Sequence, residues 1–144
     1  YGGETLSLAA CVATIKEFQE KNVCRHMWQI SEMFREGYNK IAKENELDSE
    51  CIGYYPRLKI IIRDEKGDES MLLKSFFLQE LVEKGIFMHP NTVLFSFSHS
   101  KENIEYTLKC INDVLHSLKK EMNDGTIRDS IKGEIPKEVI RMLK

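Results

Sequence analysis

A pair of glycines precedes the first apolar segment of this 144-residue sequence. Gly2 and Gly3 follow Tyr1 and lead directly into "ETLSLAAC". Because backbone N–H groups at a helix N-terminus attract anions, such a turn could hold a phosphate group. A plain turn is the alternative, since a Gly-Gly pair alone is not specific for phosphate. The pattern makes residues 1–3 a candidate phosphate-binding turn and leaves both interpretations open.

The four cysteines are the next residues that could do chemistry, as ligands of a metal ion or as a redox centre. Cys11, Cys24, Cys51 and Cys110 are far apart and form no C-x-x-C pair. Cys11 and Cys110 lie in apolar helical stretches, where a free thiol packs like a small hydrophobic side chain. We therefore expect buried, reduced cysteines and no metal site. A thiol or metal site built from these four residues is the alternative.

Histidines and lysines provide few further candidates. His89 and Asn91 flank Pro90 in a predicted loop, where they could line a cleft or lie on the surface. His99 stands where a strand gives way to a helix, and we expect it to help cap the helix start or to pack that junction rather than to catalyse. No lysine stands in a context that predicts a desolvated amine. Because no Ser-His-Asp or Cys-His arrangement can be argued from spacing, the residues taken alone predict no catalytic group.

The composition is that of an ordinary globular domain. Hydrophobic residues make up 42% of the chain and charged residues 31%, with a net charge of −2. A nucleic-acid-binding domain would normally carry a basic face, so we expect no nucleic acid partner. No apolar run reaches the about 20 residues of a membrane-spanning helix, so we expect no membrane partner. Together with reduced cysteines, these features predict a cytoplasmic protein.

The hydrophobic pattern predicts helices beside a small sheet. The first helix, over Glu4–Gln19, carries apolar residues on two faces, which predicts that both faces are buried. The further predicted elements are helices over Val23–Asn45, Ser70–Lys84 and Ser100–Met122, strands over Tyr54–Asp64, Ile86–Met88 and Val93–Phe97, and a last short helix that begins at Pro136. This order predicts the α+β class, with a small antiparallel sheet covered by helices.

Two separate blocks of the sequence resemble one enzyme family. "YGGETLSLAACVATIKEF" is similar to the "GGE-x-LSLAAA-x-ATI" segment of class-III pyridoxal-phosphate (PLP) aminotransferases, in the branch of glutamate-1-semialdehyde aminomutase. "LLKSFFLQELVEKGIFMHPNTVLFSFSHSKENIEYTLKCINDVL" resembles that branch's "LFLQEML-x-RG" helix and its "S-x-AHT-x-ED-I" segment. Ser96, His99 and Ile104 fall on matching positions, whereas Ser100 and Asn103 replace the usual Thr and Asp. The two blocks keep the family's order and span most of the chain.

The resemblance implies the C-terminal part of a fold-type-I enzyme. In that fold a long helix connects a large cofactor domain to a small α+β domain. Residues 1–20 would comprise the end of the cofactor-phosphate turn and this connecting helix. Residues 21–123 would form the small C-terminal α+β domain, and residues 124–144 a tail with a short helix. The connecting helix would pack against the upstream large domain of the same polypeptide.

The resemblance also implies where the chemistry of the family lies. The lysine that forms the Schiff base with PLP precedes the Tyr-Gly-Gly turn in the family, so this chain would be inactive alone and would bind no PLP by itself. The full-length enzyme would bind PLP, form a homodimer and transfer an amino group to or from an aldehyde or keto substrate. Tyr1, Gly2 and Gly3 would contact the cofactor phosphate, and His89 and Asn91 would face the substrate cleft.

Two departures from the family concern the substrate. Many class-III aminotransferases hold an α-carboxylate with an Arg of this domain, but no Arg lies between Arg63 and Arg128. Asn91 also stands where the aminomutase carries an acidic residue. These departures argue against a standard α-amino acid and against the aminomutase reaction. They leave open an amine or keto group on a larger scaffold, such as a sugar.

A free-standing α+β binding or regulatory module is the alternative function. The absence of a predicted catalytic residue favours it, as do the self-sufficient apolar stripes of the second and last long helices. The doubly apolar first helix argues against it. An exposed apolar patch on that helix would favour the aminotransferase interpretation, because large apolar patches are rarely left uncovered.

Overall fold

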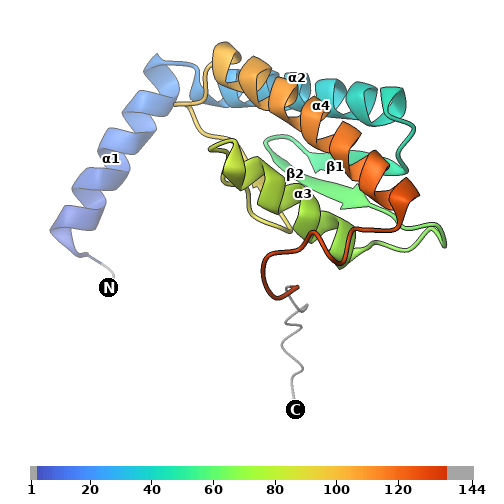
Figure 1. Cartoon of the computed structure of the whole chain (residues 1–144). Helices are drawn as coiled ribbons and strands as arrows, with labels where there is room; N and C mark the ends of the chain where they lie inside the picture. Colours follow the sequence, from blue (N-terminus) through green and yellow to red (C-terminus); the bar gives the residue numbers. More distant parts are fainter. Residues whose placement is uncertain (1–2, 136–144) are drawn as a thin grey trace.

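The computed structural model describes residues 3–135 and confirms the α+β class (Figure 1). The described elements are α1 (Thr5–Glu20), α2 (Val23–Glu44), β1 (Ser49–Tyr54), β2 (Arg57–Ile62), α3 (Met71–Glu83), β3 (Val93–Leu94) and α4 (Lys101–Asp124). The strands form one antiparallel sheet in the order β1-β2-β3, so β2 is the central strand. The helix predicted from Pro136 lies outside the described residues.

Local hydrogen bonds determine where α4 begins. The side chain of Ser100 accepts the N–H of Asn103 at 3.2 Å, and the Asn103 side chain accepts the N–H of Ser100 at 2.9 Å. This reciprocal capping box satisfies two amides that a helix start would otherwise leave unpaired. It confirms Ser100 as the predicted N-cap. Gly125, with a φ of +71°, ends the same helix in the left-handed conformation.

The core lies between one face of the sheet and the helices. Leu58, Ile60 and Ile62 alternate along β2 and are all buried. α2 and α3 contact this strand, and α4 packs against both helices, side by side with α2 in Figure 1. The rings of Tyr38 and Phe77 meet edge to face at 6.2 Å, which joins α2 to α3. These contacts make one continuous core beneath the three helices.

The sheet differs from the predicted one in all three strands. β1 was missed because only Cys51 of its six residues is buried, so no alternating apolar pattern marks it. The strand predicted over Tyr54–Asp64 begins only at Arg57, since Tyr55-Pro56 forms the hairpin turn and proline has no N–H for a strand ladder. The strand predicted over Ile86–Met88 is wrong, because those residues pair with no strand. The next one shrinks from Val93–Phe97 to β3, which pairs with only two residues of β2.

α1 extends away from the sheet, and among the described elements it contacts α2 alone (Figure 1). None of its residues is buried. The large apolar side chains of α1 are between 43% and 76% exposed, namely those of Leu6, Leu8, Val12, Ile15 and Phe18. The sequence pattern predicted that both faces of α1 are buried, but residues 3–135 bury neither face.

One lysine is buried in the core, which the sequence pattern did not predict. Lys74 of α3 is 1% exposed, and its Nζ pairs with the carboxylate of Glu69. Lys59 of β2 contacts the other oxygen of that carboxylate at 2.6 Å. Burial raises the pKa of Glu69, but hydrogen bonds and charge from Lys59 and Lys74 outweigh it, so the pKa is lowered overall. Glu69 is thus the counter-charge that allows Lys74 to be buried.

We expect Glu69→Gln to lower the free energy of unfolding by about 1–3 kcal/mol at pH 7, because it leaves the buried ammonium without its partner. Glu65→Gln, a matched change at an exposed position of the neighbouring turn, should change it by less than about 0.5 kcal/mol. The stabilisation from a carboxylate with a lowered pKa is present above its unfolded pKa and lost as the pH falls through its folded pKa. Urea unfolding should therefore show that the unfolding free energies of the unchanged chain and Glu69→Gln become more similar below about pH 4. An equal difference in unfolding free energy at pH 7 and at pH 3 would contradict this.

Candidate functional site

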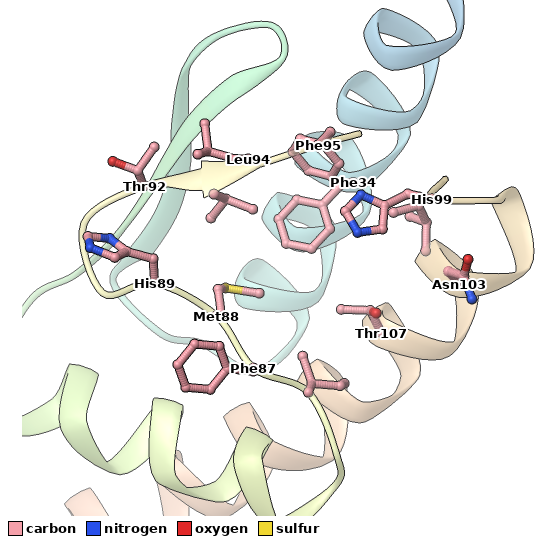
Figure 2. A pocket seen from close by; sticks show the side chains of 13 residues that line it. Phe34, Phe87, Met88, His89, Thr92, Leu94, Phe95, His99, Asn103 and Thr107 are labelled. Carbon is pink, nitrogen blue, oxygen red and sulfur yellow. The ribbon is translucent and has the colours of Figure 1, made fainter. Parts of the chain in front are cut away.

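A pocket of about 220 Å³ lies between the segment that links α3 to α4 and the first turns of α4 (Figure 2). We call it the α3–α4 pocket. It is lined by Phe34, Ile86, Phe87, Met88, His89, Thr92, Val93, Leu94, Phe95, His99, Asn103, Ile104 and Thr107. An apolar lining with a few polar groups is typical of small-molecule sites.

Two hydrogen bonds hold His99 at the start of α4, one to its ring and one to its backbone carbonyl. Its Nδ1 accepts the N–H of Ser96 at 3.1 Å, so the neutral ring carries its proton on Nε2. Its carbonyl oxygen accepts a hydrogen bond from Nε2 of His26 at 2.8 Å, which ties α4 to the first turn of α2. The predicted junction role of His99 is confirmed. Figure 2 shows that its ring also points into the pocket, towards Phe34.

His89 stands at the opposite rim of the pocket (Figure 2). The N–H of Asn91 donates to Nδ1 of His89 at 3.2 Å, so the neutral ring of His89 also carries its proton on Nε2. The Pro90-Asn91 turn that follows His89 therefore fixes its orientation. Both histidines of the pocket then offer an N–H donor from Nε2 rather than an acceptor.

The structure separates the two residues predicted to face a cleft. His89 lines the α3–α4 pocket, whereas Asn91 lines a shallow groove along the β1–β2 hairpin, beside Tyr54 and Pro56. The role of both residues towards a substrate stays a prediction. Asn103 and Thr107 line the pocket but were not identified from the sequence. Their spacing of four, which puts both polar side chains on one helix face, is the signal that could have found them.

The candidate phosphate turn is described only at its last residue. Tyr1 and Gly2 lie outside the described residues, and Gly3 has a φ of +95°, which a turn glycine adopts without strain. The Glu4 carboxylate accepts the N–H groups of Leu6 at 2.9 Å and Ser7 at 2.6 Å. Hydrogen bonds from Ser7 and Leu6 hold the pKa of Glu4 below its usual value. An anion of the chain itself therefore already accepts two of the first-turn amides of α1.

The cysteines divide into two exposed and two buried thiols. Cys51 and Cys110 are buried, whereas the predicted burial of Cys11 and Cys24 is wrong, because α1 and the start of α2 leave them exposed. Burial raises the pKa of Cys51 to about 12. Within residues 3–135, no group of three or more His, Cys, Asp or Glu side chains is placed to hold a metal ion. Over the same residues, no helix combines the length and the apolar character needed to cross a membrane.

We expect an aromatic disulfide reagent at pH 8 to modify two thiols rapidly in the folded chain, those of Cys11 and Cys24. The thiolate is the attacking form, and Cys51 has a pKa far above this pH, while Cys110 is shielded by burial. In guanidinium chloride all four thiols should react at similar rates. Peptide mapping of the modified protein identifies the sites, and rapid modification of Cys51 in the folded chain would contradict the structure.

The sequence is similar to curated glutamate-1-semialdehyde 2,1-aminomutases. It is 29% identical to the enzyme of Desulfitobacterium hafniense (strain DSM 10664 / DCB-2) over 128 residues, which cover 81% of this chain and 29% of that protein. It is 23% identical to the enzyme of Archaeoglobus fulgidus over 126 residues, which cover 80% of this chain and 30% of that protein. The chain thus spans less than a third of the length of these relatives. No protein-family model matches the sequence.

The fold is similar to that of solved structures. It matches a glutamate-1-semialdehyde-aminomutase from Pseudomonas aeruginosa PAO1 with a TM-score of 0.69 and 21% identity, over 81% of this chain and 28% of that one. It matches the PLP internal aldimine form of the FumI protein from Sphingopyxis sp. MTA144 with a TM-score of 0.72 and 15% identity, over 80% of this chain and 27% of that one. The sequence and structure matches confirm the predicted resemblance to the aminomutase branch of the PLP aminotransferases.

Proposed function

We propose that this chain forms the connecting helix and the small C-terminal domain of a cytoplasmic, homodimeric class-III PLP aminotransferase or aminomutase. The observation that carries the proposal is the match to aminomutases over 81% of this chain but only 29% of theirs. The large domain, with the lysine that holds the cofactor, would lie upstream in the same polypeptide. PLP bound there supplies an electron sink for amino-group transfer. Without that domain the chain would bind no PLP and would be inactive.

The exposed apolar side of α1 supports an upstream partner domain. Leu8, Val12 and Ile15 repeat at helical spacing, and each is more than half exposed. A contiguous apolar surface of this kind is rarely left in water. The large domain would cover this side of α1, which would then connect the two domains of one enzyme.

Two parts of this chain would contribute to the active site of the whole enzyme. Backbone amides of Tyr1, Gly2 and Gly3 would bind the cofactor phosphate, since the first-turn amides of α1 are already bound to Glu4. The loop that contains His89 and Asn91 would close one side of the substrate cleft. These residues would orient the substrate and exclude water, while the reacting groups would come from the large domain.

A free-standing binding or regulatory module is the second candidate function. The observation that favours it is the core, which α2, α3, α4 and the sheet form without any buried residue from α1. A domain of this kind would fold by itself and would use the α3–α4 pocket or the face of α1 for binding.

Sequencing the coding DNA upstream of the Tyr1 codon distinguishes the two candidates. We expect an open reading frame that continues through a Ser/Thr-rich turn and includes a lysine further upstream, and we expect the longer polypeptide to bind PLP and this chain alone not to. A start codon or an unrelated domain directly before Tyr1 would instead favour the module.

The apolar side of α1 can be tested in the chain itself. If it is an uncovered domain interface, the chain should bind a hydrophobic fluorescent dye or self-associate, and Val12→Glu should remove most of the dye signal. Thr14→Glu adds the same charge to the same helix, about 200° around its axis from Val12, and should leave the signal unchanged. Both positions are exposed, so neither variant should change stability by more than about 0.5 kcal/mol. A monodisperse monomer that binds no dye would favour the module.

A further inference from the structure

Apolar side chains form most of the wall of the α3–α4 pocket opposite α4, where His89 and Thr92 are the polar residues. Phe87, Met88 and Leu94 lie on this side in Figure 2, and Phe87 is 91% exposed at the mouth. Among the described residues, the thirteen that line the pocket include no Asp, Glu, Lys or Arg. Placing an ionised carboxylate against such a wall costs free energy unless a cation pairs with it. The lining therefore disfavours a charged ligand group.

The α4 side of the pocket offers neutral hydrogen-bond donors. His99 presents Nε2–H, because its Nδ1 is taken by the N–H of Ser96. Asn103 uses its side-chain oxygen for Ser100, so its amide group retains N–H donors. Thr107 adds a hydroxyl one turn further along α4. Neutral donors, most of them on the α4 side, and a mainly apolar opposite wall suit a carbonyl group attached to an apolar body.

We infer that the α3–α4 pocket binds the uncharged, apolar body of a ketone or aldehyde in preference to a carboxylate. Its volume of about 220 Å³ lies below the roughly 300–1,000 Å³ of pockets for drug-sized ligands, which limits the occupant to a single ring or a short branched chain. That the occupant is the enzyme's substrate rests on the proposed function. Binding of this occupant depends on the pocket-lining residues, which lie between positions 34 and 107, and it needs neither PLP nor the large domain.

A matched pair of probes tests the inference on the chain as it is. Acetophenone and 4-acetylbenzoate share the ring and the ketone and differ by one carboxylate. In titrations followed by amide NMR shifts, acetophenone should move the signals of Leu94, Asn103 and Thr107 and bind at least about tenfold more tightly than 4-acetylbenzoate, a difference of about 1.4 kcal/mol. Equal or tighter binding of the carboxylate, or acetophenone shifts that avoid these residues, would overturn the inference.

Introducing a cation should reverse the preference. Thr107→Lys places an ammonium group in the pocket, so we expect 4-acetylbenzoate to bind this variant more tightly than acetophenone. Ser117→Lys adds the same charge to an exposed position of α4 outside the pocket and should keep the original preference. If Thr107→Lys does not fold, Leu94→Lys on the opposite wall, where Leu94 is 64% exposed, makes the same test. An unchanged preference in a folded lysine variant would overturn the inference.

The inference and the proposed function fail in different experiments. Absence of acetophenone binding, with a PLP domain found upstream, would overturn the pocket's ligand class and leave the enzyme family standing. Binding of acetophenone in the pocket, with no PLP domain upstream, would support the ligand class and overturn the aminotransferase proposal.

Discussion

The burial of one face of β2 beneath α2 and α3 is the interaction on which the rest of the structure depends. Leu58, Ile60 and Ile62 provide an apolar face that water would otherwise cover, and burying it contributes roughly 1.5–3 kcal/mol for each side chain. α4 then packs against α2 and α3, so its position follows from theirs. The segment between α3 and α4 must cross from one helix to the other over this core, and its course creates the pocket.

One local and one long-range set of hydrogen bonds fix the start of α4. The capping box of Ser100 and Asn103 satisfies the helix amides locally, while the bond from His26 to the carbonyl of His99 joins α4 to α2 across 73 residues of sequence. α1 meets α2 near the same end of the domain (Figure 1). In the proposed enzyme, a large domain that covers α1 would therefore lie close to the pocket.

The four described helices were predicted well because each carries a local signal. The apolar stripe of α2, Ser100 as a cap and the apolar stripe of α4 need no knowledge of the partner they pack against. The strands were predicted poorly, because a strand exists only through its neighbour. Cys51 alone marks the buried side of β1, and the segment over Ile86–Met88 has the composition of a strand but no strand beside it.

The sequence by itself determined the α+β class, the approximate boundaries of the four described helices and the resemblance to PLP aminotransferases, because these depend on periodicity, caps and short motifs that neighbouring residues carry. Only the tertiary structure decided that His89 lines a pocket that Asn91 does not, and that His99, Asn103 and Thr107 share it. It likewise decided that Lys74 is buried and that Cys11 is not. Burial and proximity of side chains depend on which elements pack together, and in this chain contacts between distant segments set both.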